Sequence, residues 1–381
     1  MEYKRLGDYI RPVDVRNREL KVTNLLGLSI EKKFITSIAN TIGTDMSVYK
    51  IVKPTQFAYV PVTSRNGDKI TIALYKGVDD AIISQAYTVF EIKNQEKLLP
   101  EYLMMWFRRP EFDRYARFHS HGSAREVFDW DELCNVQLPI PSIDRQREIV
   151  SEYEALSSRI RLNEQMIANL EETAQALYRK MFVDGVDKEN LPEGWHLKKF
   201  GTLVDVKRGA SPRPIDQYMA KEGLPWLKIS DATNAKSPYI IDVKECIKKE
   251  GLSSTVYRHA GDLVLSNSAS PGLSKFLGID SCIHDGWLYF DNSSLPLQFL
   301  YLTFLHIRKD LVAEGNGAVF INLNTEILKE WEIIQPDEKT MDFFCNSANV
   351  LFSLMKTIAL EILKQNQLQS LLLARMGKEK L

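Results

Sequence analysis

A long stripe of apolar residues follows residue 142. Residues 142–182 contain neither Gly nor Pro, and apolar side chains recur there at alternating spacings of four and three. Nine of the ten stripe positions are apolar or aromatic, and this repeat predicts a long helix that packs in a coiled coil. The one polar member, Asn163, is expected to fix the register of the packing. The stripe consists of Ile149, Tyr153, Leu156, Ile160, Asn163, Ile167, Leu170, Ala174, Leu177 and Met181.

A second stripe lies 195 residues later with the same phase. Eight of its ten positions are apolar, which predicts a second long helix. Neither helix can bury its stripe alone, so we expect the two to pack together, antiparallel. The 33 residues from Ile149 to Met181 would span roughly 50 Å, on the order of 14 base pairs of DNA. The alternative is a coiled coil whose only role is to dimerise the protein or to hold its modules apart. The second stripe consists of Phe344, Ala348, Leu351, Met355, Ile358, Ile362, Gln365, Gln369, Leu372 and Met376.

The segments before the two helices echo each other, which indicates an internal duplication. Residues 4–7 (KRLG) correspond to 198–201 (KKFG), and residues 26–30 correspond more loosely to 227–231. Residues 56–59 fall opposite 262–265, Tyr102-Leu103 opposite Phe299-Leu300, and Pro141 opposite Pro336. Between these anchors the two halves are nearly unrelated. Such a pattern is typical of two modules that share a skeleton and differ in surface.

Each module alternates short strand-like runs with turns and a few helices. Residues 70–75 (ITIALY) and 262–265 (DLVL) are rich in β-formers and are bounded by Gly, Asn, Ser or Pro. We therefore predict an α+β protein: two mixed α/β modules in a pseudo-two-fold repeat, separated by two long antiparallel coiled-coil helices. The expected boundaries are 1–141 for the first module, 142–183 for the first helix, 184–193 for a linker, 194–336 for the second module and 337–381 for the second helix.

Composition restricts the class of protein but does not indicate a function. The net charge is −1, and the modules carry 20 Lys+Arg against 18 Asp+Glu (1–141) and 16 against 16 (194–336). Charge alone therefore does not indicate DNA binding, which usually accompanies a basic excess. The four cysteines lie far apart, which argues against a disulfide framework and a cysteine zinc site. No apolar run approaches a membrane span and no signal region opens the chain, so a cytoplasmic protein is expected.

Several phrases resemble the specificity (S) subunits of Type I restriction-modification systems, the HsdS family. Residues 138–149 (LPIPSIDRQREI) look like the turn that opens the first central helix of those proteins, and residues 191–195 (LPEGW) like the start of their second target recognition domain. Residues 226–231 (WLKISD) and 261–266 (GDLVLS) match the usual course of that domain. The resemblance covers the whole chain in order. One departure is the second junction, residues 333–338 (IIQPDE), which lacks the double-proline turn.

The resemblance implies a non-catalytic subunit. Two target recognition domains would each read one half of a bipartite, asymmetric DNA sequence, with the helix pair setting the spacer between them. Two modification subunits would bind S-adenosylmethionine and methylate adenine, and two restriction subunits would add ATP- and Mg²⁺-dependent translocation and cleavage. No cofactor is expected on this chain.

Enzyme motifs are missing in agreement with this. The sequence contains no Pro-Pro pair, which an adenine methyltransferase loop requires, and no phosphate-binding loop of the Walker type. Asp14 and Glu19-Leu20-Lys21 lie too close together for a metal nuclease. His119 and His121 could form a metal pair only with a third ligand that the sequence does not identify, so a surface loop is the preferred interpretation. We predict neither a catalytic nor a metal site.

Candidate DNA contacts are polar and basic residues in turn-rich segments, because Arg, Lys, Asn and Ser supply donors and acceptors to base edges. Most such residues would contact phosphate and position the protein rather than read sequence. In the first module they are Lys32, Lys33, Lys53, Ser64, Arg65, Asn66 and Arg125. In the second they are Lys207, Arg208, Ser211, Arg213, Lys228, Ser230, Asn234, Lys236, Ser266, Asn267 and Ser268.

The outer faces of the first helix are charged and could be solvated or could meet a modification subunit. The competing functional hypothesis is a coiled-coil scaffold whose globular arms bind proteins rather than DNA. The charged residues are Glu152, Glu154, Arg159, Arg161, Glu164, Glu171 and Glu172.

Overall fold

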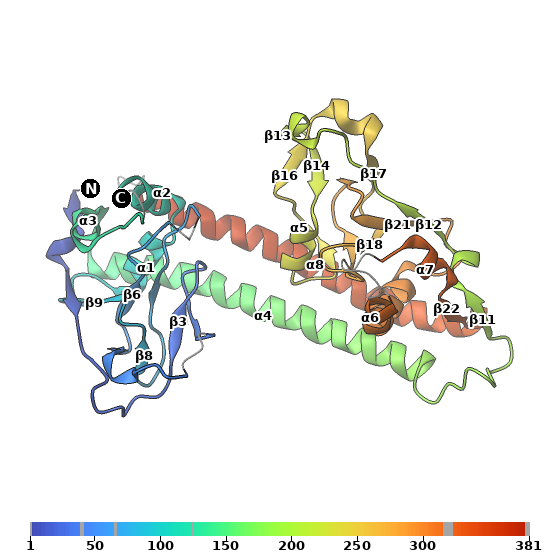
Figure 1. Ribbon diagram of the computed structural model, residues 1–381, viewed down its shortest axis with the longest axis horizontal. Coiled ribbons are helices and arrows are strands. Elements are labelled where there is room, and N and C mark those ends of the chain that lie inside the picture. The colour runs from blue at the N-terminus through green and yellow to red at the C-terminus, as the bar shows by residue number, and fades with distance from the viewer. Residues whose placement is uncertain (1, 39–41, 65–66, 123–124, 315–322, 378–381) are drawn as a thin grey trace. The chain divides into compact units, whose positions relative to one another are not determined.

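The computed structural model describes residues 2–38, 42–64, 67–122, 125–314 and 323–377 (Figure 1). The chain forms two compact units. Unit 1 comprises Met1–Ser158 and Asn366–Leu381, and unit 2 comprises Arg159–Gln365. Each unit therefore contains one module and parts of both long helices.

Unit 1 is built on an antiparallel four-stranded sheet and a smaller group of strands. The helix α1 (Pro100–Phe107) is apolar on nearly every side and lies in the core, where the ring of its Phe107 packs against those of Phe57 and Phe90. The sheet has the order β2 (Ile10–Val13), β9 (Thr88–Ile92), β6 (Phe57–Tyr59), β7 (Ile72–Leu74). The smaller group contains the hairpin β3 (Leu26–Leu28) and β4 (Phe34–Thr36) and the pair β5 (Lys50–Val52) and β8 (Ala81–Ile83). The helices are α1 (Pro100–Phe107), α2 (Pro110–Phe118) and α3 (Trp130–Asn135).

Unit 2 has two five-stranded sheets. The first has the order β12 (Asp205–Arg208), β21 (Trp287–Asp291), β18 (Leu263–Ser266), β19 (Ser274–Leu277), β15 (Tyr239–Ile240). The second has the order β13 (Met219–Ala220), β16 (Glu245–Ile247), β14 (Leu224–Leu227), β20 (Ser281–Ile283), β17 (Val256–Arg258). The helices are α5 (Ile229–Asn234), α6 (Leu297–Glu314) and α7 (Thr325–Glu330).

The strand pairing confirms the predicted repeat. The order β2-β9-β6-β7 in unit 1 is the order β12-β21-β18-β19 in unit 2, and both are antiparallel. In the second group β3 joins β8 through one parallel bridge, Leu25 to Ile82, as β14 pairs with β20 in parallel. The first and last strands of each module also form a ribbon: β1 (Tyr3–Arg5) with β10 (Gln137–Pro139), and β11 (His196–Lys199) with β22 (Glu332–Gln335).

The two long helices are α4 (Ile143–Phe182) and α8 (Glu338–Arg375), each leaving the ribbon of its module. Their contacts run antiparallel within unit 2, where Asn163 bonds to Gln365 and the ring of Phe182 lies 5.2 Å from that of Phe344. Within unit 1, Nε2 of Gln369 donates to Oγ of Ser157 at 2.7 Å. All fourteen predicted seam residues are buried or half-buried: Ile149, Tyr153, Leu156, Ile160, Asn163, Ile167, Leu170, Leu177, Phe344, Leu351, Met355, Ile358, Ile362 and Leu372.

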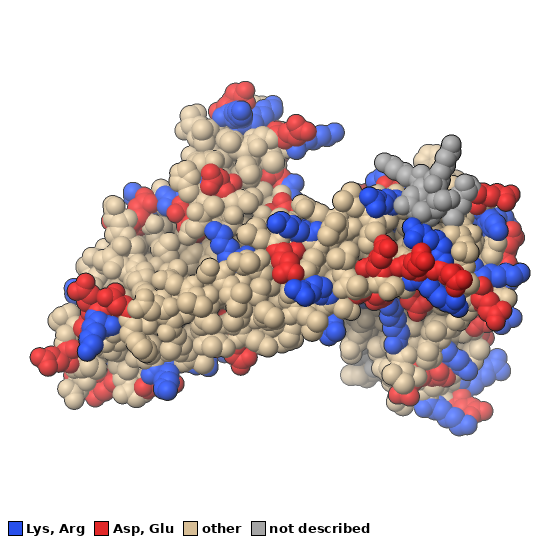
Figure 2. Space-filling model, turned by 180° about the vertical axis from the view of Figure 1, so that it is seen from behind, with Lys and Arg blue, Asp and Glu red and all other residues tan. Residues whose placement is uncertain are grey.

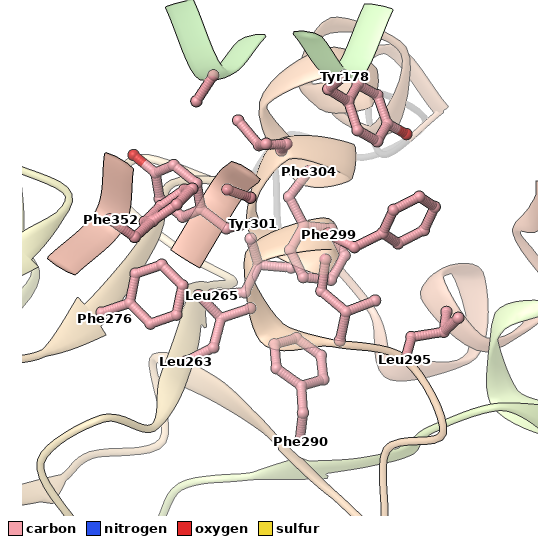
Figure 3. Close-up of a cluster of buried hydrophobic side chains, with 14 of the residues drawn as sticks. Tyr178, Leu263, Leu265, Phe276, Phe290, Leu295, Phe299, Tyr301, Phe304 and Phe352 are labelled. Carbon is pink, nitrogen blue, oxygen red and sulfur yellow. The ribbon is translucent and has the colours of Figure 1, made fainter. Parts of the chain in front are cut away.

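The seam is wider in unit 2 than the heptad pattern predicts. Tyr178 and Phe352, which lie outside the predicted stripes, are 6% and 1% exposed. Both face α6, whose Phe299 and Tyr301 occupy the space between the long helices and the sheet strands β18, β19 and β21 (Figure 3). The helix α6 therefore covers both the seam between α4 and α8 and one face of the sheet.

Asp337 sets the start of α8, the boundary that lacks the double-proline turn. Its carboxylate accepts hydrogen bonds from the backbone N–H (3.0 Å) and hydroxyl (2.6 Å) of Thr340, the pattern of a helix N-cap. Nε1 of Trp195 donates to the same carboxylate at 2.9 Å. These bonds hold the pKa of Asp337 below its usual value, with the Thr340 hydroxyl as the largest cause.

By length and composition alone α8 is apolar enough to cross a membrane. In the structure part of that apolar surface is the buried seam, including Phe344, Met355 and Ile358. The remainder includes an exposed stripe, Phe343, Val350 and Leu354, and the exposed side chains of Leu360, Leu368 and Leu371.

Candidate nucleic-acid interface

The second module carries a surface hollow where several sequence-predicted residues meet. Its cavity volume is about 430 Å³. Five of the predicted DNA contacts line it, although they come from three separate segments of the chain: Ser211, Arg213, Lys228, Ser230 and Ser268. The rest of the lining is Ile215, Trp226, Ile229, Ala269, His284 and Asp285. We name this hollow, with these eleven residues, the module-2 hollow.

Strand ends bring these segments together. Residues 209–214 follow β12, Lys228 follows β14 and caps α5, and Ser268 follows β18. Gly209 packs on the turn that joins β20 to β21, because a Cβ there would lie 2.2 Å from the carbonyl oxygen of His284. Its N–H donates to the carbonyl of Trp287 at 2.9 Å. Gly209 therefore fixes the basic loop against the floor of the hollow.

Asp285 is the centre of the hydrogen-bond network. Its carboxylate accepts bonds from Oγ of Ser211 at 2.7 Å and Nη2 of Arg213 at 3.3 Å. Its backbone carbonyl accepts bonds from Arg208 and from Nδ2 of Asn267. The bond from Ser211, more than any other contact, lowers the pKa of Asp285, so the carboxylate is ionised at neutral pH.

Most predicted cations of this module are paired with carboxylates. Nζ of Lys228 lies 2.6 Å from Glu245, Nζ of Lys207 lies 2.9 Å from Asp291, and Nζ of Lys236 lies 2.8 Å from Glu164. Exposed pairs of this kind are weak, so an approaching phosphate can compete for each ammonium. The pairing accounts for a module that offers exposed basic groups without a net positive charge. On the face in Figure 2, basic and acidic side chains are likewise interspersed.

His284 is a site residue that the sequence did not reveal. Its ring lies 5.9 Å from that of Trp226 and 6.2 Å from that of Trp287. Nδ1 accepts a bond from the N–H of Gly286 at 2.8 Å, which places the proton of the neutral ring on Nε2. Burial lowers the pKa of His284, so the ring is a neutral donor at pH 7.

Burial argues against three of the predicted DNA contacts. Ser266 is 0% and Asn267 is 3% exposed. Ser266 closes the turn after β18, since its Oγ accepts from the N–H of Leu273 at 3.1 Å. Lys32 of the first module is 6% exposed and its Nζ lies 2.7 Å from Asp113, so its ammonium neutralises that half-buried carboxylate. Desolvation lowers the pKa of Lys32, and the ion pair opposes that effect.

The remaining predicted residues that the structure describes lie at the surface but do not gather at one place. Asn234 is exposed on α5. In the first module Ser64 and Arg125 flank one ribbon, because the N–H of Thr63 donates to the carbonyl of Glu126 at 2.9 Å. Lys33 and Lys53 are exposed elsewhere. Arg65 and Asn66 lie outside the described residues.

The first module has a larger hollow that the sequence analysis largely missed. It has a volume of about 880 Å³ and is lined by Lys69, Arg108, Arg114 and Arg117 as well as Glu31, Lys32, Asp68 and Asp113. Phe118, 80% exposed, stands at its edge. A signal was present: Arg114 and Arg117 lie three apart on the polar face of α2, opposite the buried Phe112. We name this basic surface the α2 hollow.

Comparison with known proteins identifies the family. A family model described as "Type I restriction modification DNA specificity domain" matches residues 13–172 and again residues 192–370. The Type I restriction enzyme HindI specificity subunit of Haemophilus influenzae is 22% identical, over 97% of each chain. The MjaIX specificity subunit of Methanocaldococcus jannaschii is 20% identical, over 68% of this chain and 63% of its own.

A solved structure agrees in fold. The S subunit of a Type I restriction-modification system from M. genitalium matches 100% of this chain and 96% of its own with a TM-score of 0.57. Its sequence identity is 12%, so the likeness concerns the fold alone. The two family matches together cover most of the chain, one in each half. The chain therefore belongs to the Type I restriction modification DNA specificity family and is a specificity subunit of a Type I restriction-modification system.

Proposed function

We propose that this subunit reads a bipartite, asymmetric DNA sequence, one half with each module, and leaves the chemistry to partner subunits. The observation that carries the proposal is the module-2 hollow. There Ser211, Arg213, Lys228, Ser230 and Ser268 converge from three segments of the chain. A random set of surface residues would not be expected to meet in this way.

The side chains of this hollow suit base edges. A guanidinium such as that of Arg213 donates two parallel bonds to guanine O6 and N7, and hydroxyl groups such as those of Ser211 and Ser230 either donate or accept. Lys207 in β12 and Lys236 after α5 are exposed and suit phosphate contacts. On binding, phosphates would displace the carboxylates that now pair with these ammonium groups.

In the first module the α2 hollow is the better candidate than the dispersed residues of the sequence analysis. Arg114 is exposed and forms an ion pair with Glu111 of its own helix, at 3.3 Å. Arg108 lies 5.8 Å from the ring of Tyr153 and keeps its guanidinium at the surface of the hollow. An exposed aromatic residue, Phe118, beside such groups offers a stacking or apolar contact to a base.

We further propose that modification subunits dock on the exposed stripe of α8. Phe343, Val350 and Leu354 are 64%, 67% and 43% exposed, and exposed apolar residues in a row are typical of protein contact surfaces. The charged face of α4 is a weaker candidate, because Glu154, Glu164 and Arg159 pair with Lys76, Lys236 and Glu361. In this proposal S-adenosylmethionine, ATP and Mg²⁺ bind to the modification and restriction subunits.

Adenine-methylation mapping of a host genome tests the proposal. The chain is co-expressed with the modification subunit encoded beside it, and the motif is compared with that of the double variant Arg213→Ala/Lys228→Ala. We expect a split motif with a fixed spacer in the wild type. In the variant we expect the half read by the second module to be relaxed or lost, because one good bidentate base contact is worth about 1–3 kcal/mol.

Lys244→Ala is the matched control, since Lys244 is exposed in the same module but does not line the hollow. It should leave the motif unchanged. If the wild type assembles with the modification subunit and no new methylation follows, the proposal fails. That result would favour the hypothesis that the chain is a scaffold whose globular arms bind proteins. An unaltered motif in Arg213→Ala/Lys228→Ala would remove the module-2 hollow from the reading surface.

A further inference from the structure

The structure places a third metal-binding side chain beside the two histidines of the first module. Nδ1 of His119 lies 3.2 Å from one oxygen of Glu132, and Nε2 of His121 lies 3.8 Å from the other. One ligand atom of each residue lies within 4.8 Å of the others. We propose that His119, His121 and Glu132 bind one Zn²⁺-like divalent cation. The inference does not depend on the proposed DNA-reading function.

The backbone around each ligand is held in place. His119 caps the C-terminal end of α2, and its N–H donates to the carbonyl of Tyr115 at 3.0 Å. His121 and Val127 exchange both backbone hydrogen bonds, at 3.0 and 2.9 Å. Glu132 lies in the first turn of α3, where its N–H donates to Oδ1 of Asp129 at 2.8 Å. The three side chains are thus presented by anchored segments rather than by a free loop.

One ring contact also orients the site. The imidazole of His119 lies over the ring of Tyr115, with centroids 4.2 Å apart and planes inclined by 33°. His119 and Glu132 have side chains that are 32% and 24% exposed, whereas that of His121 is 70% exposed. Two ligands are therefore partly shielded from water, and the third can close over a cation from the solvent side.

The spacing and the donor types suit zinc. Bonds of about 2.0–2.2 Å to nitrogen and oxygen put tetrahedral ligand atoms about 3.4 Å apart, and the two His–Glu132 contacts, at 3.2 and 3.8 Å, lie on either side of that value. Two imidazoles and one carboxylate are a known donor set for this metal, and they leave a fourth position for water. Imidazole also selects Zn²⁺, Ni²⁺, Cu²⁺ and Co²⁺ over Mg²⁺ and Ca²⁺, which favour all-oxygen sites.

Binding would have a local consequence. The cation would tie residues 119–121, at the end of α2, to α3. The same loop carries Arg125, and its ribbon with Val62 and Thr63 leads to Ser64. Metal binding is thus expected to stiffen a surface segment of the first module and to raise its resistance to unfolding.

Calorimetric titration of the full-length chain with Zn²⁺ tests the proposal, and Co²⁺ serves as a probe because its visible absorption reports tetrahedral coordination. We expect one tightly bound equivalent in the wild type. His121→Ala and Glu132→Gln should each weaken binding by about tenfold or more, since even outer partners of metal ligands contribute that much. His259→Ala is the control, because His259 faces one carboxylate, Asp280 at 3.6 Å, and belongs to no group of three possible ligands among the described residues.

His121 is the safest residue to remove, since its side chain is mostly in solvent. Thermal unfolding without metal checks that each variant is folded. Zinc held by the half-exposed Cys246 or Cys345 would persist in both ligand variants. If the wild type binds no Zn²⁺, or if His121→Ala and Glu132→Gln bind it as the wild type does, the proposed site does not exist and the three side chains form only a hydrogen-bonded surface cluster.

Discussion

Asn163 and Gln365 meet across the buried seam between α4 and α8, with Nδ2 of Asn163 3.4 Å from Oε1 of Gln365. They are 4% and 7% exposed. Asn163 is the one polar position of the first stripe, and it meets Gln365, one of the two polar positions of the second. A one-turn slip of either helix would break this contact between the two buried amides, so the pair favours one register.

The first prediction concerns this pair. Asn163→Ala removes the donor to the buried Oε1 of Gln365, whose Nε2 still donates to Glu361, and should lower the free energy of unfolding by about 1–3 kcal/mol, measured by denaturant unfolding. Asn169→Ala on the same helix removes an exposed bond to Gln165 and should have little effect. The double variant Asn163→Leu/Gln365→Leu should recover much of the loss. Equal losses in Asn163→Ala and Asn169→Ala would show that the seam amide has no special role.

The second prediction concerns the loop of the module-2 hollow. Gly209→Ala places a methyl group 2.2 Å from a backbone carbonyl oxygen that cannot move freely. We expect a loss of about 1–3 kcal/mol in stability, as for other overpacked sites, together with weaker recognition by the second module. Gly27→Ala is the control, because the nearest atom to a Cβ there is 3.9 Å away. Normal stability and normal methylation in Gly209→Ala would contradict the proposed packing.

The third prediction uses cysteine chemistry. Cys282 is 0% exposed, and burial raises its pKa to about 11. Only about one molecule in a thousand would carry its thiolate at pH 8, and the thiolate is the reactive form. A thiol reagent should therefore label the half-exposed Cys246 and Cys345 in the native protein and reach Cys282 only after unfolding. Comparison of Cys246→Ser with Cys282→Ser assigns the signal, and native labelling of both at similar rates would refute the prediction.

The fourth prediction concerns pH. Because burial holds the pKa of His284 below 6.5, the unfolded chain takes up a proton there before the folded chain does as the pH falls. This contribution to stability is complete above pH 6.5 and is lost below it. His284→Asn, which keeps an acceptor for Gly286, should therefore lose less thermal stability than the wild type between about pH 7.5 and pH 5.5. His196→Asn, at an exposed histidine, should follow the wild type.

The fifth prediction concerns the exposed stripe of α8. Val350→Lys/Leu354→Lys puts charges on an apolar surface that we propose as a docking site, while leaving the buried face intact. The variant should fold normally and should lose the modification subunit in a pull-down assay. Ser353→Lys, exposed between these positions, is the control for added charge. If the double variant retains the modification subunit, the docking surface does not include this stripe of α8.

Much of the architecture was predictable because it rests on short-range patterns. The seam from Ile149 to Leu177 follows from the period of one helix, and each position can be assigned without knowing its partner. The repeat was visible because Leu6-Gly7 and Phe200-Gly201 occupy the same turn after equivalent strands, as the helices η1 (Leu6–Asp8) and η3 (Phe200–Thr202) show. Such patterns remain visible after the two halves of the sequence have diverged, because each pattern depends only on residues within its own segment.

The candidate sites depended on contacts between distant segments, which no local pattern contains. Burial of Lys32 against Asp113 is decided by residues 81 positions apart, and a lysine in a turn otherwise looks exposed. The pairing of Glu132 with His119 and His121 requires the chain to turn back at Val127. In the module-2 hollow, Ser211 and Asp285 are 74 residues apart. The sequence by itself therefore determined the modules, the helices and the chemical type of the surface residues. Only the tertiary structure decided which of those residues share a hollow, because strand pairing brings the ends of β12, β14, β18 and β20 together.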